Sequence, residues 1–203
     1  MPLRILVVLF ALLASGVAAK ADPITVTVTD TAYVAIGAGD NSETSQNVTI
    51  TFTGDTSNVA YNPLYDLYSI DPGTATIQIE DLGTFTFNDT AEFFDNQDFD
   101  NQGISIAGIA LSNGVVILAT DNAAFGSYTG TTNIGPLSGT AAGSTDYGYY
   151  TSGGFLDFAG IGPTSTLTAS VDTAPAPTPE PSSLALLGTG LLGFAATIRR
   201  RLR

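Results

Sequence analysis

Three residue types that serve catalysis and ligand binding in many proteins are missing from this 203-residue chain, which has no cysteine, no histidine and no tryptophan. Without cysteine there is no disulfide, no thiolate nucleophile and no cysteine-ligated metal site. Without histidine, Ser-His-Asp and Cys-His triads and histidine-ligated zinc are excluded as well. Lacking tryptophan, the chain also has no indole for stacking on a sugar. The sequence therefore predicts a protein that is not an enzyme.

Positively charged residues are scarce, and they are confined to the two ends of the chain. The six Lys and Arg are Arg4, Lys20, Arg199, Arg200, Arg201 and Arg203. The acidic residues lie between these two groups, from Asp22 to Glu180. Such a body has no lysine for a Schiff base, and its negative potential disfavours nucleic acid and anionic lipid headgroups. We expect no nucleic-acid partner.

The N-terminal segment has the three parts of a secretory signal peptide. Arg4 precedes the unbroken apolar run ILVVLFALL at residues 5–13, and small residues then lead to an A-x-A site formed by Ala19 and Ala21. The apolar run is too short to span a bilayer as a permanent helix. We predict a signal helix in residues 1–21, cleaved after Ala21 or alternatively after Ala19. The rest of the chain is therefore expected to be exported.

The C-terminal segment has the layout of a membrane anchor. Residues 174–183 form a Pro-rich linker, and residues 184–198 carry no charge and contain several Leu and Gly. This run is shorter than the roughly 20 residues that a spanning helix needs, but snorkelling arginines extend it. Basic residues that flank a span stay on the cytoplasmic side. We therefore predict a transmembrane helix at residues 184–198 and a cytoplasmic tail at residues 199–203.

Three other kinds of C-terminal segment share some of these features. A soluble helix with a basic last turn would be polar on one face, whereas residues 184–198 are apolar on every face. A GPI signal does not need a terminal arginine cluster. A cell-wall sortase signal would carry an LPxTG-like pentapeptide, which this sequence lacks. The membrane stop is therefore assigned to the arginines Arg199, Arg200, Arg201 and Arg203.

The apolar run is preceded by Pro179, Glu180, Pro181 and Ser182 and followed by the arginines. These three parts form one recognisable combination. Together they resemble the PEP-CTERM sorting signal of Gram-negative bacteria. The resemblance implies an exosortase-like partner that recognises the Pro-Glu-Pro region and removes the tail. It also implies an inner-membrane intermediate, followed by the cell surface or the exopolysaccharide matrix of a biofilm. The resemblance is confined to the C-terminal segment and the signal peptide.

Residues 22–173 remain as one exported domain, and their pattern is that of β-strands. Apolar residues alternate with Thr or Gln, the period of a half-buried strand, in four segments: residues 24–29, 48–53, 76–80 and 84–87. Two more continuous apolar segments, residues 104–111 and 115–120, flank Ser112-Asn113-Gly114. An Asn-Gly pair in this position is a strong signal for a β-hairpin.

Further strands are expected at residues 65–70, 147–151, 155–158 and 165–171, and a long loop with weak strands at residues 123–144. Many short strands with frequent turn residues predict an all-β fold. We expect an antiparallel β-sandwich, with a jelly roll or a partly open barrel as variants, between the signal helix and the transmembrane helix.

The densest polar stretch is EFFDNQDFDNQG, residues 92–103. Asp98, Asp100, Gln102 and the following glycine match the start of a calcium-binding loop, with Asp95 just ahead. An EF-hand needs a glutamate at the twelfth position of its loop, but the twelfth position counted from Asp98 is Ile109. An EF-hand is therefore rejected. The alternatives are a calcium site in a β-loop and a solvated acidic loop whose phenylalanines anchor it, and the second is favoured.

Two further readings of the acidic residues remain. A weaker candidate cluster consists of Asp66 and Asp71 near Tyr61, Tyr65 and Tyr68. Two carboxylates could also make a glycan-active enzyme.

Our leading hypothesis is an exported, non-enzymatic structural or adhesive protein without a cofactor. The alternative is a calcium-dependent carbohydrate-binding module of the exopolysaccharide matrix, and a glycan-active enzyme comes last.

Overall fold

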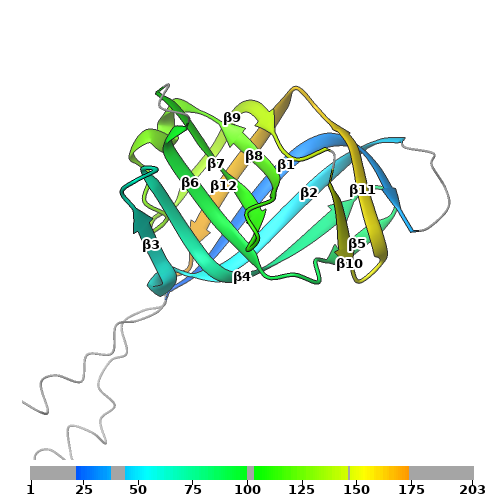
Figure 1. Ribbon diagram of the computed structural model, residues 1–203, viewed down its shortest axis with the longest axis horizontal. Coiled ribbons are helices and arrows are strands. Elements are labelled where there is room, and N and C mark those ends of the chain that lie inside the picture. The colour runs from blue at the N-terminus through cyan, green and yellow to red at the C-terminus, as the bar shows by residue number, and fades with distance from the viewer. Residues whose placement is uncertain (1–21, 38–43, 100–102, 146, 174–203) are drawn as a thin grey trace, which may run out of the picture. The chain divides into compact units, whose positions relative to one another are not determined.

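The structure is a computed structural model, and it describes residues 22–37, 44–99, 103–145 and 147–173 (Figure 1). The chain divides into two units, Met1–Asp172 and Thr173–Arg203, and every strand that the structure describes belongs to the first. The predicted signal helix and transmembrane helix lie outside the described residues. In the ranges that are described, no helix is both long enough and apolar enough to cross a membrane.

The described part of the first unit consists mostly of β-strands, and all of their pairings are antiparallel. In chain order the elements are β1 (Pro23–Ile36), β2 (Thr44–Asp55), η1 (Thr56–Asn58), β3 (Val59–Asn62), β4 (Leu67–Ile79), β5 (Gly83–Thr86), β6 (Ala91–Phe99), β7 (Ile104–Leu111), β8 (Val116–Asp121), η2 (Ala123–Ser127), β9 (Ile134–Ala142), β10 (Gly148–Thr151), β11 (Gly154–Ile161) and β12 (Thr164–Val171). The elements η1 and η2 are short 3-10 helices of three and five residues.

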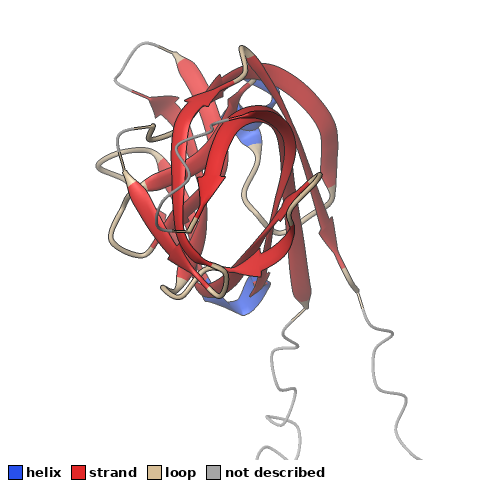
Figure 2. Cartoon of the chain, turned by 90° about the vertical axis from the view of Figure 1, so that its right-hand side faces the viewer, coloured by secondary structure: helices blue, strands red, loops and turns tan. Residues whose placement is uncertain are grey.

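One sheet closes on itself to form a barrel. Its order is β1-β12-β9-β8-β7-β6-β4-β2, and β1 pairs with β2 along most of its length to complete the ring. Figure 2 shows the strands curving around this closed wall. The prediction of an antiparallel all-β domain is confirmed. The predicted β-sandwich would have two separate sheets, whereas the structure has a single closed sheet. It closes because β1 pairs with both β2 and β12.

The barrel is extended on one side by β5, β10 and β11 (Figure 1). The first half of β1 pairs with β12, whereas its last residues pair with β11. The hairpin of β10 and β11 in turn meets the end of β5, where the Asn88 amide donates to the Tyr150 carbonyl at 2.9 Å and the Ser152 amide donates to the Thr86 carbonyl at 2.8 Å. These bonds cover strand edges that would otherwise be open to pairing.

Side chains fill the space inside the strands. In β1 the apolar residues Ile24, Val26 and Val28 are fully buried, and threonines alternate with them on the outer face. The largest side chains in this core are Tyr149, Phe52, Phe93, Phe125, Phe158, Ile24, Ile50, Ile70, Ile77, Ile79, Ile109 and Leu111. Each large apolar side chain contributes about 1.5–3 kcal/mol on burial, so this continuous core holds the sheet closed.

The turn η2 adds two aromatic residues to this core. Asn122 caps the turn because its Oδ1 accepts the Ala124 amide at 2.9 Å. Phe125 is then buried, and the Tyr128 ring meets the Phe93 ring edge to face at a centroid distance of 6.1 Å. The Tyr128 hydroxyl donates to the Thr132 carbonyl at 2.8 Å, so its polar end is satisfied.

Most predicted strands are present, and the hairpin at Ser112-Asn113-Gly114 is confirmed, with Gly114 at a φ of 84°. Two corrections concern the length of elements. The strands predicted at residues 65–70 and 76–80 are parts of the single strand β4, which begins at Leu67. The loop predicted at residues 123–144 contains β9, a full strand of the barrel.

The strand β9 was missed because its residues are small and polar, and none of its side chains is fully buried. At Gly139 a Cβ atom would stand 1.6 Å from the carbonyl oxygen of Asp121. Only glycine allows β8 and β9 to approach this closely. The same glycine that lowers the strand propensity of the segment is therefore required by its place in the barrel.

Candidate functional site

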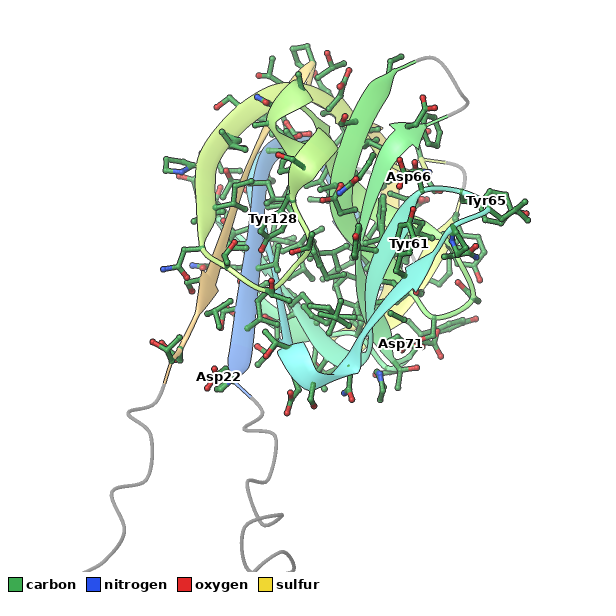
Figure 3. All side chains as sticks on the ribbon, turned by 90° about the vertical axis from the view of Figure 1, so that its left-hand side faces the viewer. Asp22, Tyr61, Tyr65, Asp66, Asp71 and Tyr128 are labelled. Atoms are coloured by element: carbon green, nitrogen blue, oxygen red, sulfur yellow. The ribbon has the colours of Figure 1, made fainter. Side chains whose placement is uncertain are left out.

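A pocket of about 570 Å³ opens where the turn between β3 and β4 meets the end of β6. The lining residues are Tyr61, Pro63, Leu64, Tyr65, Asp66, Asn96, Asp98 and Phe99. Figure 3 shows Tyr61, Tyr65 and Asp66 close together on one side of the domain, with Tyr65 projecting outward. The pocket therefore combines residues from two segments that are about thirty positions apart in the sequence.

The turn from β3 to β4 is held by hydrogen bonds of its own first residue. The Oδ1 atom of Asn62 accepts the Leu64 amide at 3.0 Å, and the Asn62 carbonyl accepts the Tyr65 amide at 3.3 Å. Asp66 then adopts a φ of 47°, a left-handed conformation that aspartate tolerates better than most residues. Its carbonyl accepts the Gln97 amide at 2.9 Å, which ties the turn to β6.

Large apolar and aromatic side chains are unusually exposed around the pocket. The exposed fraction is 78% for Leu64, 60% for Tyr65, 49% for Tyr61 and 41% for Phe99. The Tyr61 ring packs against the Tyr68 ring at a centroid distance of 4.6 Å, with the two ring planes tilted by 34°, and this contact orients it. Exposed aromatic rings that are held in place offer flat surfaces to a ligand at low entropic cost.

Carboxylate and amide oxygens lie among these rings. The Tyr61 hydroxyl donates to Asp66 Oδ1 at 2.9 Å, and this hydrogen bond raises the pKa of Tyr61. Asp98 accepts the Gly103 amide on Oδ1 at 2.7 Å, and its own amide donates to Asn96 Oδ1 at 3.2 Å. A carboxylate has about four acceptor positions, so these single bonds leave acceptor capacity for a ligand.

The residues predicted as a calcium site are divided by the structure. Asp95 is fully buried in β6, whereas Asp98 lines the pocket, and Asp100 and Gln102 lie outside the described residues. Within the described ranges, no group of three or more acidic side chains is placed to hold a metal ion. Asp98 instead accepts the backbone amide of Gly103, which has a φ of 69°. Calcium binding stays a prediction.

Asp95 is a buried acid without a hydrogen-bond partner on either carboxylate oxygen. Burial raises its pKa to about 8, and the nearby charge of Asp66 contributes to the increase. The Tyr128 pKa is also raised, first by burial and then by the charge of Asp95. Asp95 is therefore mostly protonated at neutral pH, and it belongs to the core and not to the pocket.

The weaker of the two predicted clusters contributes three of the eight residues that line the pocket. Tyr61, Tyr65 and Asp66 line it, and Tyr68 supports the Tyr61 ring, but Asp71 accepts the Ser112 hydroxyl at 3.0 Å instead. The loop predicted at residues 92–103 is wrong in its first part, because Ala91–Phe99 forms the strand β6. A loop prediction does not place Asn96 and Phe99 beside the tyrosines. Recognising that β6 pairs with β4 across Leu67 and Asn96 would have placed them there.

Among known protein families, the PEP-CTERM protein-sorting motif matches residues 177–201 of the chain. The chain carries a PEP-CTERM sorting signal. Comparison with curated proteins and with solved structures gave no match. The signal implies an exported protein that passes through the membrane and is processed by an exosortase.

The matched residues include most of the predicted sorting and membrane-stop positions. Pro179, Glu180, Pro181 and Ser182 fall within the PEP-CTERM match, as do the first three arginines of the terminal cluster. Arg203 follows the match. All of these residues, and the predicted cleavage positions Ala19 and Ala21, lie outside the described residues.

Proposed function

We propose that this PEP-CTERM protein is a non-enzymatic adhesive protein of the cell surface or the exopolysaccharide matrix, and that its pocket holds a polysaccharide. One observation carries the proposal: exposed aromatic rings and carboxylate oxygens line the same pocket. Sugar rings present apolar C–H faces that stack on aromatic side chains, and their hydroxyl groups donate hydrogen bonds to carboxylates and amides. Tyr61, Tyr65, Asp66 and Asp98 supply both kinds of contact.

The sorting signal supports the extracellular setting of this proposal. A protein processed by an exosortase is delivered outside the cytoplasm, where polysaccharide is the abundant polymer of the matrix that the family resemblance implies. Deleting residues 179–203 should abolish surface or matrix localisation, as measured by cell fractionation and immunolabelling. If the truncated chain distributes like the full-length chain, the surface or matrix assignment is wrong.

The placement of the titrating acids supports a binding role over a catalytic one. A general acid for glycoside cleavage must reach the substrate and have a raised pKa. Asp95 has the raised pKa but is buried away from the pocket lining. A glycan-active enzyme is the second candidate, because two carboxylates, Asp66 and Asp98, line the pocket.

The test uses the exported protein purified from its producing cells and matrix polysaccharide from the same cells. Tyr65→Ala should lower the affinity at least about tenfold, or ~1.4 kcal/mol, because it removes a 60% exposed ring from the pocket. Tyr150→Ala is the matched control, since Tyr150 is 63% exposed but lies on β10, outside the pocket. The control should bind like the wild type.

Other outcomes separate the alternatives. Loss of binding in a chelator would favour the calcium-dependent module over a metal-free pocket. New reducing ends after incubation would favour the enzyme. No retention of any polysaccharide by the wild type would overturn the proposed function.

A further inference from the structure

We propose that the ligand of the pocket carries protonated amino groups, so that the polysaccharide it binds is one that contains amino sugars with free amines. This inference rests on the proposed function for the site and adds the chemical class of the sugar. Three features of the molecule lead to it: the charge of the domain, the chemistry of the pocket lining, and the exposed faces of its aromatic rings.

The charge of the domain restricts the ligand first. From residue 22 to residue 198 the chain has no Lys, Arg or His, so no side chain of the described domain can pair with an anion. A uronic acid, a sulfated sugar or a phosphate would meet only negative charge. Recognition of such groups relies on arginine or lysine. Anionic polysaccharides are therefore poor ligands for this surface.

The pocket lining adds a specific reason to prefer a cation. Asp66 and Asp98 lie in the same pocket and have no basic residue near them in the sequence or in the described structure. Their known partners are neutral groups, the Tyr61 hydroxyl and the Gly103 amide. An ammonium group has three donors and a positive charge, so it suits two such carboxylates better than a hydroxyl group does.

The aromatic rings favour the same group. Tyr61, Tyr65 and Phe99 expose 41–60% of their surface in or around the pocket. A cation over the face of an aromatic ring is attracted by the negative potential of that face, also at an exposed site. Because the Tyr61 ring packs against Tyr68 and its hydroxyl donates to Asp66, this ring is already in place before a ligand arrives.

Neither a bound metal ion nor a neutral sugar uses all three features. In the parts of the chain that the structure describes, no three acidic groups converge as a metal site needs. A neutral sugar would stack on the rings but would leave the two carboxylates without a counter-charge. An amino sugar stacks on the rings and also neutralises the carboxylates.

The experiment compares two probes of equal length with the purified exported protein: an oligomer of glucosamine and its fully N-acetylated form. Calorimetry at about pH 6, where the free amine is protonated, should give an affinity at least about tenfold higher for the free-amine oligomer. This preference should fall as salt is raised, because exposed charges are screened. An equal affinity for both probes would overturn the inference and leave the proposed function in place.

Two matched variants test whether the effect belongs to the pocket. Asp98→Asn removes one pocket charge, and it should lower the affinity for the free-amine oligomer several-fold more than the affinity for the acetylated oligomer, so that the preference for the free amine falls. Asp157→Asn removes the same charge from β11, outside the pocket, and should leave the preference unchanged. Thermal unfolding confirms that both variants are folded. Equal losses in the two variants would show a diffuse attraction to the acidic surface and would overturn the inference.

Two further outcomes complete the test. A lysine oligomer that binds the pocket as tightly as the free-amine sugar would point to a basic protein partner, which would overturn the assignment to a polysaccharide. Failure to bind either sugar probe or the matrix polysaccharide would overturn the proposed function together with this inference.

Discussion

Strand β6 places one acidic side chain in the core and another in the pocket, and the two have different environments. Asp95 faces the core, where it is fully buried, lacks a hydrogen-bond partner and has a raised pKa. Asp98, three residues later, lines the pocket and accepts the Gly103 amide. An irregularity in the β6–β7 pairing lies between Asn96 and Phe99, around Asp98. The same residue type on one strand therefore affects stability in one region and ligand binding in the other.

The largest effect on stability is expected from replacing a phenylalanine of the core, compared with a phenylalanine of the pocket. Phe93→Ala should lower the free energy of unfolding by about 3–5 kcal/mol, because it leaves a cavity beside Phe52 and Tyr128. Chemical denaturation measures this loss. Phe99→Ala on the same strand removes a ring that is 41% exposed, and it should change stability by less than about 1 kcal/mol while weakening polysaccharide binding. Equal destabilisation by the two variants would contradict the division between core and pocket.

The second prediction concerns the pH dependence of stability. The folded-state pKa of Asp95 is raised from 3.8 to about 8, so its protonated form is the one that suits the fold. The contribution of Asp95 to stability should therefore be fully present near and below pH 4, and it should be lost as the pH rises through about 8. Over this range the free energy of unfolding should fall by up to about 1.4 kcal/mol per pH unit. Asp30 and Glu92, whose pKa values burial also raises, add to the same trend.

Variants of the two acids on β6 test this pH dependence. Asp95→Asn keeps the shape of the side chain and cannot ionise, so it should flatten the decline and leave the protein about 2–4 kcal/mol more stable than the wild type near pH 9. Thermal unfolding between pH 4 and pH 9 measures the difference. Asp98→Asn removes the same charge from the pocket and should keep the wild-type slope. A flattened slope in that variant would mean that net charge, and not the buried acid, sets the pH dependence.

The smallest effect is expected at the turn that shapes the pocket. Asn62→Ala removes the side-chain acceptor of the Leu64 amide, an interaction worth roughly 1 kcal/mol. The turn should loosen, and the affinity for polysaccharide should fall a few-fold because Tyr65 is held less well. Asn62→Asp keeps the acceptor and serves as the control. Unchanged binding in both variants would mean that the turn is not needed to present Tyr65.

Sequence reasoning recovered most of the strands but only part of the pocket. The alternation of Val, Ile and Thr is local, so segments such as residues 24–29 and 165–171 were predicted without knowledge of their partners. The strand β6 was missed because Asp95 occupies an inward position, where an apolar residue would have completed the alternation after Phe93. Without that strand, the pairing of Asn96 with Leu67 could not be foreseen, and the pocket could not be assembled.

The sequence by itself determined the sorting signal, the all-β class and the absence of basic residues from the exported domain, since each depends on residues that are near one another in the chain or on composition alone. Only the tertiary structure decided that the sheet closes into a barrel, that Asp95 is buried while Asp98 is not, and that the turn between β3 and β4 forms one pocket with the end of β6. The physical reason is that strand pairing is a long-range interaction: β1 meets β2, β11 and β12, and its choice of partners is set by the packing of the whole core.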